Sequence, residues 1–184
     1  MGSPPEIPKS KNNYSHALFT KDWVGLASKF EVSPNSCKNP EHFKEYLLYR
    51  AIPDGLSGRA TTHILLDSNK ENIIGFFSLK ATTLITDQAN SRITGEPALE
   101  IYNLAVSKDH ILQGIGTTLV FGAIHIAQYI NKNHIGIKYI VLTSVPEAVD
   151  FYKKCKFVKM EDYYTLPTDN ENNSCIPMIM KLYS

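Results

Sequence analysis

The sequence lacks the features that would place it in several functional classes. It has no CxxC pair, and its three cysteines, Cys37, Cys155 and Cys175, are widely spaced, so we expect neither a zinc site nor a disulfide framework. It has no apolar run near the roughly 20 residues that span a bilayer, and no visible signal peptide. No histidine pair has metal-ligand spacing. These absences predict a cytoplasmic protein with free thiols, no metal and no membrane partner.

A strong net charge is also missing. The 184 residues include 19 lysines and arginines against 18 aspartates and glutamates, which gives +1 at neutral pH. Bulk charge therefore does not drive binding, and a nucleic-acid partner would need a local basic patch. An apolar fraction of 43% is ordinary for a globular chain. We expect a flexible arm over residues 1–15 and one domain over residues 16–184.

Hydrophobic periodicity and turn signals predict alternating strands and helices. Pro53 is expected to end the helix over residues 40–50. Gly75 is expected to mark a bulge or a close approach of the backbone. The polar stretches 87–97 and 168–174 are expected to form loops. The order of elements predicts a mixed sheet with helices on its faces. Helices are expected over residues 40–50, 114–131 and 146–155, and strands over residues 61–67, 73–83, 98–107, 138–144, 157–164 and 176–183.

Residues 99–127 contain the most informative motif, a strand followed by a short loop with Gly114 and Gly116 and then a helix. The first turn of a helix presents unpaired backbone N–H groups at the positive end of its dipole, so a phosphate is the natural ligand. The motif is neither a Walker A loop nor a dinucleotide fingerprint, since Leu119 stands where a third glycine is needed. The alternative is that both glycines only make a tight turn.

Two side chains are candidates for acid–base chemistry. Tyr152 lies on the helix expected over residues 146–155, where its hydroxyl either donates a proton to a leaving group or only reaches water from a helix–sheet contact. Glu100 interrupts an apolar strand and shares a face with Tyr102 and Leu104 by alternation. It is either a base in a cleft, or a solvent-facing residue or salt-bridge partner.

In this order and spacing, the motifs resemble the GNAT superfamily of N-acetyltransferases over about residues 61–183. The run Glu-Ile-Tyr-Asn-Leu-Ala-Val at residues 100–106, followed by Gly114 and Gly116, resembles its acetyl-CoA strand and its Arg/Gln-x-x-Gly-x-Gly/Ala motif. Ile111 replaces the Arg/Gln of that motif. The resemblance implies the GNAT fold, a mixed α+β structure. Its mostly antiparallel twisted sheet has about six or seven strands, is splayed between the fourth and fifth, and is flanked by helices.

Residues 148–157 resemble the family signature Ala-x-x-(Leu/Phe)-Tyr-x-x-x-Gly-Phe. Lys156 stands at the usual glycine, and Val145 stands where an Asn often contacts the cofactor. The resemblance implies that Tyr152 is the general acid. Glu100 occupies the position at which histone-acetylating members carry their base, so it is a base candidate, directly or through water.

Acetyl-CoA is the implied cosubstrate, attacked directly by an amine in a ternary complex without a covalent enzyme intermediate. Pantetheine would pair with backbone near Leu104 and Val106, whose N–H would polarise the thioester oxygen. The pyrophosphate would lie on the N–H groups of residues 114–118. The implied cofactor-binding residues are Leu104, Ala105, Val106, Ile111, Leu112, Gln113, Gly114, Ile115, Gly116, Thr117, Thr118, Ser144, Phe151 and Tyr152.

A narrower resemblance is to GNAT toxins of bacterial toxin–antitoxin pairs, which acetylate aminoacyl-tRNA. Cys37-Lys38-Asn39-Pro40 with the helix that follows, and residues 73–79, are similar to their small-residue-rich helix and GYYxL-type strand. Glu100 departs from the toxins, which usually have an apolar residue there. Lys153, Lys154, Lys156 and Lys159 are either an RNA surface on the acceptor side or a solvated helix face.

The leading prediction is acetyl transfer from acetyl-CoA to a primary amine of a small molecule or peptide. One alternative is an aminoacyl-tRNA acceptor, which the near-neutral charge does not favour. Another is a non-catalytic module that binds a CoA thioester or acts through protein contacts. A homodimer is left open.

Overall fold

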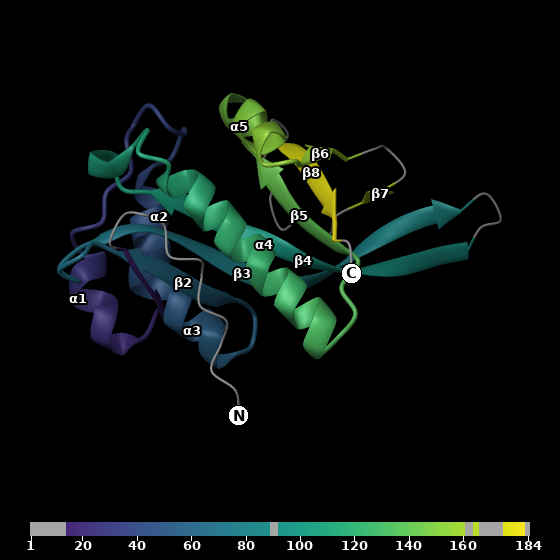
Figure 1. The fold of residues 1–184 in the computed structure, drawn as a ribbon, viewed down its shortest axis with the longest axis horizontal. Helices are drawn as coiled ribbons and strands as arrows, with labels where there is room; N and C mark the ends of the chain where they lie inside the picture. Colours follow the sequence, from purple (N-terminus) through teal and green to yellow (C-terminus); the bar gives the residue numbers. More distant parts are fainter. Residues whose placement is uncertain (1–13, 89–91, 161–163, 166–174, 183–184) are drawn as a thin grey trace. The chain divides into compact units, whose positions relative to one another are not determined.

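The computed structural model describes residues 14–88, 92–160, 164–165 and 175–182 (Figure 1). The chain forms two compact units, each built from two segments. Unit 1 takes the described residues up to Leu79 together with Tyr102–His125, and unit 2 takes Lys80–Ile101 together with the described residues from Ile126 onward. Among the described residues, no helix is long and apolar enough to cross a membrane.

Strands β3 (Ile73–Gln88) and β4 (Arg92–Val106) and helix α4 (Ile115–Asn133) each pass from one unit to the other. The other elements of unit 1 are β1 (Ser15–Leu18), η1 (Lys21–Trp23), α1 (Val24–Ala27), α2 (Glu41–Glu45), η2 (Tyr46–Arg50), α3 (Ala51–Leu56), β2 (Thr61–Leu66) and η3 (Lys108–His110). Those of unit 2 are β5 (Tyr139–Ser144), η4 (Pro146–Ala148), α5 (Val149–Lys154), β6 (Val158–Lys159), β7 (Tyr164–Thr165) and β8 (Ile176–Lys181).

The strands follow the hydrogen-bonded order β1-β2-β3-β4-β5-β8-β6, and β7 pairs with β3. The β4–β5 pair is parallel, as the crossover through α4 allows, and the other described pairs given by register are antiparallel. The predicted mixed, mostly antiparallel sheet with flanking helices is therefore confirmed.

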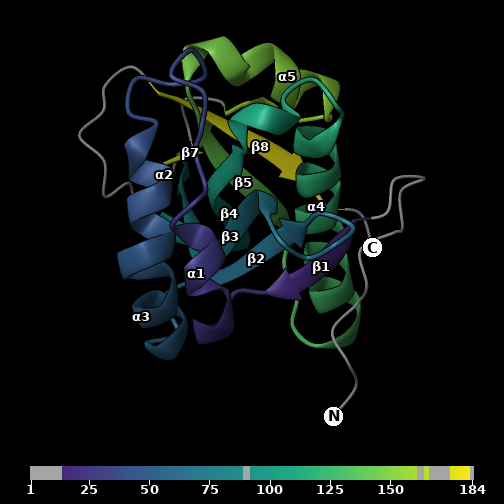
Figure 2. The same ribbon diagram turned by 90° about the vertical axis from the view of Figure 1, so that its left-hand side faces the viewer.

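In unit 1 the two faces of the sheet pack against different helices (Figure 2). Phe76 stacks on Tyr46 of η2, within a core that also includes Leu47 and Ile64. On the other face, a Cβ at Gly75 would lie 2.8 Å from Leu119 Cδ1 and 3.0 Å from the Ala105 carbonyl oxygen. The pairing of β2 with β3 also shifts register here, between Leu65 and Leu66. Gly75 thus marks both a bulge and a close approach of the backbone.

Three rings stack across β1, β2 and β3 in unit 1. His63 lies between His16 and Phe77, with ring centroids 5.0 Å and 4.9 Å away. A hydrogen bond of 2.9 Å joins His16 Nε2 to His63 Nδ1. These contacts attach the four-residue strand β1, which was not predicted because it is too short to show a period.

The first helix ends later than predicted, at Leu56 rather than before Pro53. Proline cannot donate to the carbonyl four residues earlier, here that of Tyr49, and its ring clashes with that carbonyl in a regular α-helix. The five residues Tyr46–Arg50 form a π-helical turn directly before this point, and such a turn widens the backbone. The helix therefore continues through the proline instead of ending there.

Two other expectations are wrong in unit 2. The polar stretch 87–97 is not a loop, because β3 extends to Gln88 and β4 begins at Arg92, with residues 89–91 outside the described residues. Residues 94–97 of β4 are half-buried or exposed, and a strand with a solvated face needs no continuous apolar run, so polarity did not exclude strands here. The strand expected over residues 157–164 is instead two short strands, β6 paired with β8 and β7 paired with β3. The loop expected over residues 168–174 lies outside the described residues.

Candidate functional site

The C-terminal half of β4 extends beyond its partner. Its parallel pairing with β5 ends at Ile101, whereas β4 continues through Tyr102–Val106. In this stretch Leu104 and Val106 are half-buried, and Ala105 between them is buried. The residues predicted to pair with pantetheine thus lie on the part of β4 that follows its register with β5.

The loop after β4 leads into α4 through two left-handed residues. Leu112 has φ of 62° and a fully exposed side chain, and Gly114 has φ of 79°. The Thr118 N–H donates to the Gly114 carbonyl at 3.0 Å, which is a helical hydrogen bond at the start of α4. The N–H groups of residues 115–117 come before it in the chain, in the first turn, where N–H groups have no partner within the helix. Such N–H groups can hold a phosphate, and this role of the helix start stays a prediction.

The missing Arg/Gln of the acetyl-CoA motif is not replaced from within this loop. Ile111, at its position, is 38% exposed. The Gln113 side chain donates to the Asp109 carbonyl at 3.2 Å, which directs its amide back along the loop. The backbone N–H groups of the helix start are therefore the donors that the loop offers a phosphate.

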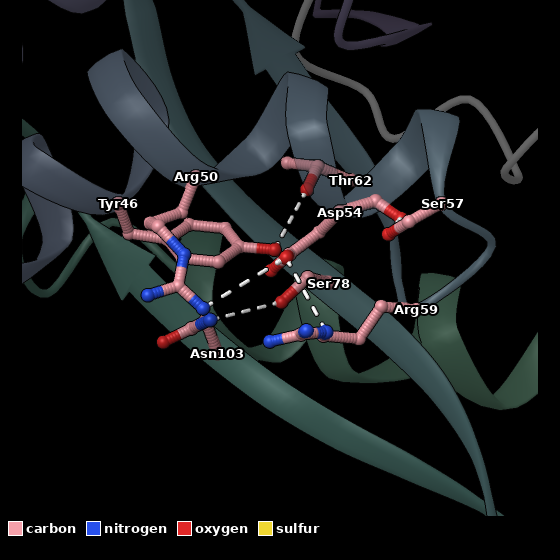
Figure 3. A network of polar contacts seen from close by, with 8 residues as sticks. All are labelled: Tyr46, Arg50, Asp54, Ser57, Arg59, Thr62, Ser78 and Asn103. Atoms are coloured by element: carbon pink, nitrogen blue, oxygen red, sulfur yellow. Dashed lines mark hydrogen bonds and ion pairs between the residues drawn. The ribbon is translucent and has the colours of Figure 1, made fainter.

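A buried polar network fixes the segment of β4 next to Leu104 (Figure 3). The Asn103 amide donates to Ser78 Oγ at 3.1 Å, and the Tyr46 hydroxyl lies 3.2 Å from Thr62 Oγ1. Burial raises the pKa of Tyr46, although its hydrogen bonds act in the opposite direction. Sequence reasoning missed this network. The available signal was polar residues at buried positions of three apolar strands.

Helix α3, which directly follows η2, contributes a second polar group, the Asp54 carboxylate, which is 3% exposed. Arg50 and Arg59 approach its Oδ1 to 3.9 Å and 3.7 Å, and the Asp54 main-chain carbonyl accepts from the N–H groups of Arg59 and Ala60. Asp54 thereby organises the turn that returns the chain from α3 to β2.

Tyr152 lies on α5 with its side chain almost buried, at 9% exposure. Its ring makes edge-to-face contacts with Phe151 at 4.9 Å and Phe157 at 6.0 Å between centroids. Burial raises the pKa of Tyr152 far above its ordinary value, and the neighbouring Cys155 adds to the rise. The phenol therefore stays protonated even above neutral pH, and a protonated hydroxyl is a hydrogen-bond donor.

The end of α5 explains why a glycine is usual where Lys156 stands. Lys156 has φ of 74°, and it donates to the Lys153 carbonyl at 2.9 Å while Phe157 donates to the Tyr152 carbonyl at 3.0 Å. These two bonds define a Schellman motif, whose left-handed residue is usually glycine. The motif ties the Tyr152 backbone to Phe157, whose ring also contacts that of Tyr152.

Lys156→Gly is expected to stabilise the protein by about 1 kcal/mol, because glycine takes the left-handed conformation without steric cost. Chemical denaturation measures this difference. The matched control is Lys154→Gly, two residues earlier within α5, which should destabilise by about 1 kcal/mol. A Lys156→Gly variant less stable than the parent would contradict the assignment.

Glu100 is buried at 8% exposure and pairs with Lys80, whose Nζ lies 3.3 Å from Oε2. Of the two non-catalytic interpretations, the structure gives the salt-bridge partner and not the solvent-facing residue. Its role as a base stays a prediction. Ser144, at the end of β5, is also buried, and its hydroxyl donates to the Val145 carbonyl at 2.8 Å.

The predicted site residues divide between the two units. Residues 104–106 and 111–118 belong to unit 1, whereas Glu100, Ser144, Phe151 and Tyr152 belong to unit 2. Within the part of the chain that the structure describes, no three His, Cys, Asp or Glu side chains gather as a metal site.

Comparisons with known proteins agree with these observations. The profile of the acetyltransferase (GNAT) family matches residues 23–157. The fold is similar to that of a tyrosine-to-phenylalanine mutant of the toxin AtaT bound to the C-terminus of the antitoxin AtaR and acetyl-CoA, at 17% identity and a TM-score of 0.70, over 92% of this chain and 94% of that one.

Two further structures show the same fold. AtaT complexed with acetyl-methionyl-tRNAfMet is 17% identical, with a TM-score of 0.70 over 91% of this chain and 94% of that one. A tyrosine-to-phenylalanine mutant of KacT is 14% identical, with a TM-score of 0.68 over 90% and 94%. A comparison with curated protein sequences finds no match. The fold implied by the sequence resemblance is thus confirmed.

Proposed function

Because the chain belongs to the GNAT family of acetyltransferases, we propose that it transfers the acetyl group of acetyl-CoA to a primary amine. The amine nitrogen attacks the thioester carbonyl, a C–N bond forms, the C–S bond breaks, and the thiolate takes a proton. The observation that carries the proposal is the segment from Tyr102 to Thr118. It combines a strand end without a β5 partner and a helix start that offers N–H groups.

Acetyl-CoA would use both parts of this segment. Pantetheine is an extended amide chain, so it can hydrogen-bond along Leu104–Val106 as an added strand would. The pyrophosphate would accept hydrogen bonds from the N–H groups of residues 115–117. The N–H near Val106 would stabilise the oxyanion that develops on the thioester oxygen.

Tyr152 is the proposed general acid. A tyrosine phenol holds its proton at neutral pH, and burial raises the pKa of Tyr152 further, so the hydroxyl is protonated and would donate to the sulfur as the C–S bond breaks. Glu100 is the proposed base, taking a proton from the attacking amine directly or through water. Its ion pair with Lys80 holds the carboxylate in one place.

Acetyl-CoA is expected to raise the unfolding temperature, by an amount equivalent to about 2.7 kcal/mol at 100 times its Kd. CoA should act similarly and ATP much less, and no shift at millimolar acetyl-CoA would contradict the proposal. Gly114→Ala should weaken binding by about tenfold or more, because alanine disfavours φ of 79°.

The matched control for Gly114→Ala is Gly58→Ala. Gly58 also has positive φ, of 70°, and at both glycines an added Cβ would have no atom within 4 Å. Both variants should lose similar stability, but only Gly114→Ala should weaken acetyl-CoA binding. Equal acetyl-CoA affinity in the two variants would remove the helix start from the site.

An aminoacyl-tRNA acceptor is the second candidate. It is favoured by the shared fold with AtaT and KacT, since one of the AtaT structures contains an acetylated aminoacyl-tRNA. CoA release measured with a panel of small amines, peptides and charged tRNA distinguishes the acceptors. Transfer to charged tRNA alone would establish the second candidate.

A further inference from the structure

Two exposed arginines of unit 1 share one buried carboxylate. The chain has only three arginines, and two of them, Arg50 and Arg59, lie 3.9 Å and 3.7 Å from Asp54 Oδ1. Their side chains are 56% and 57% exposed, whereas that of Asp54 is 4% exposed. Figure 3 shows Asp54 between the two arginine side chains, both of which are directed toward it. We call these three residues the arginine clamp.

The ion pairs of the clamp leave most of the donor capacity of the guanidinium groups unused. Structural arginine–carboxylate pairs are frequently bidentate, with two parallel N–H···O bonds. Here both contacts are longer than a hydrogen bond and both go to Oδ1, and Asp54 Oδ2 is buried without a hydrogen-bond partner. Within the described ranges, the side chains of Arg50 and Arg59 make no other ion pair or hydrogen bond. Each guanidinium therefore keeps N–H donors for a ligand.

Hydrogen bonds and strand register connect the clamp to the part of β4 that follows its register with β5. Arg59 lies three residues before Thr62, whose register partner on β3 is Ser78. Ser78 Oγ accepts from the amide of Asn103, the residue directly before Leu104. All of these residues belong to unit 1. Because β3 lies between β2 and β4, these outer strands are about 10 Å apart, which an arginine side chain and a small ligand span together.

We propose that the arginine clamp binds the carboxylate of the acceptor, so that the acceptor is a small amine with a free carboxylate, such as an amino acid. The proposal rests on the proposed acetyl transfer and deepens it by naming the acceptor class. A guanidinium group matches a carboxylate in a bidentate geometry. Asp54 is a positioning residue, because its buried carboxylate holds both guanidinium groups at one place.

The charge of the clamp favours a single carboxylate over a nucleic acid. Two arginines and one aspartate sum to +1, which one carboxylate neutralises, whereas nucleic-acid affinity comes from neutralising several phosphates at once. An aminoacyl-tRNA also has no free carboxylate, because its aminoacyl group is an ester. The clamp therefore favours a different acceptor from the second candidate above.

CoA release with L-amino acids and with the corresponding amino-acid amides tests the clamp, because the two members of each pair differ in the carboxylate. The parent protein should use the acids with a kcat/KM about tenfold or more above that of the amides, through a lower KM. The amine of an amide loses its proton more readily than that of the acid. Amine reactivity alone would therefore favour the amides, opposite to the expected preference.

The variant that carries Arg50→Gln and Arg59→Gln should raise KM for the acids by about 100-fold and leave KM for the amides within about twofold. Unchanged turnover of the amides shows that the variant is folded. Arg50→Lys with Arg59→Lys keeps both charges but loses the planar fork, and should give an intermediate KM. The matched control is Lys29→Gln with Lys70→Gln, which removes two exposed charges of the same unit and should change neither KM.

A triple variant separates loss of the clamp from the cost of a buried carboxylate without a cation. Adding Asp54→Asn to Arg50→Gln and Arg59→Gln removes that carboxylate charge together with its two partners. The triple variant should show the same rise in KM for the acids as the double variant. Full recovery of the parent KM in the triple variant would contradict direct binding by the arginines.

Three results would overturn the clamp: equal kcat/KM for acids and amides in the parent, an unchanged preference in the arginine-to-glutamine double variant, and transfer to charged tRNA alone. Thermal shifts with millimolar amino acids separate the clamp from the proposed function. If amino acids stabilise the parent but not the double variant, and no amine releases CoA, the clamp stands and the acetyl transfer is wrong. CoA release without a preference for acids contradicts only the clamp, and the absence of both shift and release contradicts both proposals.

Discussion

Tyr152→Phe is expected to lower kcat for acetyl transfer by about 100-fold or more while acetyl-CoA affinity stays nearly unchanged. The substitution removes only the hydroxyl, and the ring contacts with Phe151 and Phe157 remain. The departing thiolate would then lose the proton donor that we propose. Steady-state kinetics and acetyl-CoA titration of the same variant separate these two effects.

The control is Tyr139→Phe, which removes a hydroxyl from an equally buried tyrosine of the same unit. It should retain kcat within a few-fold. Because the pKa of Tyr152 is raised, the ratio of parent to Tyr152→Phe activity should be the same at pH 7 and pH 9. Equal turnover by parent and variant would exclude Tyr152 as the acid.

Acidification from pH 7.5 to pH 5 is expected to remove about 2 kcal/mol of stability through His63. Burial, and secondarily His16, lower the pKa of His63 from 6.5 to about 3. Between these values the unfolded chain binds more protons than the folded one, so stability falls as pH decreases through 6.5. Each pH unit contributes about 1.4 kcal/mol, and 1.5 units separate pH 6.5 from pH 5.

His63→Phe should flatten this pH dependence, because phenylalanine keeps the stack between His16 and Phe77 but does not titrate. Urea denaturation at pH 7.5, 6 and 5 measures the slope for both proteins. His42→Gln, at an exposed position on α2, should leave the slope unchanged. Parallel slopes for the parent and His63→Phe would show that His63 protonates equally in both states.

Much of the fold could be predicted because its signals are local. The apolar stripe of α4 and the β-branched strands β2, β3 and β5 each carry their own period, and all were found. Elements of four residues are too short to show a hydrophobic period, so β1 and α1 were not predicted. The first helix continues past Pro53 directly after the π-helical turn of η2, and no residue type in the sequence indicated such a turn.

The parts of the candidate site that could be predicted are those in which a residue type, such as glycine, indicates a backbone conformation. Gly114 indicated either a phosphate site or a tight turn before α4, and the structure has a left-handed residue there. The sequence showed Lys156 only as a lysine at a position where the family signature usually has glycine. The residue type did not indicate that its φ is positive. The partners of Glu100 and Asn103, which are Lys80 and Ser78, come from the neighbouring strand, and no spacing within one segment indicates them.

The interleaving of the two units bears on how the chain is made. Because β3, β4 and α4 each cross between units, neither unit is a continuous stretch of polypeptide. A ribosome must synthesise as far as His125 before unit 1 has all its parts, and unit 2 is by then begun but lacks everything from Ile126 onward. A fragment that holds one whole unit therefore also holds a piece of the other, and no single truncation point separates the two units.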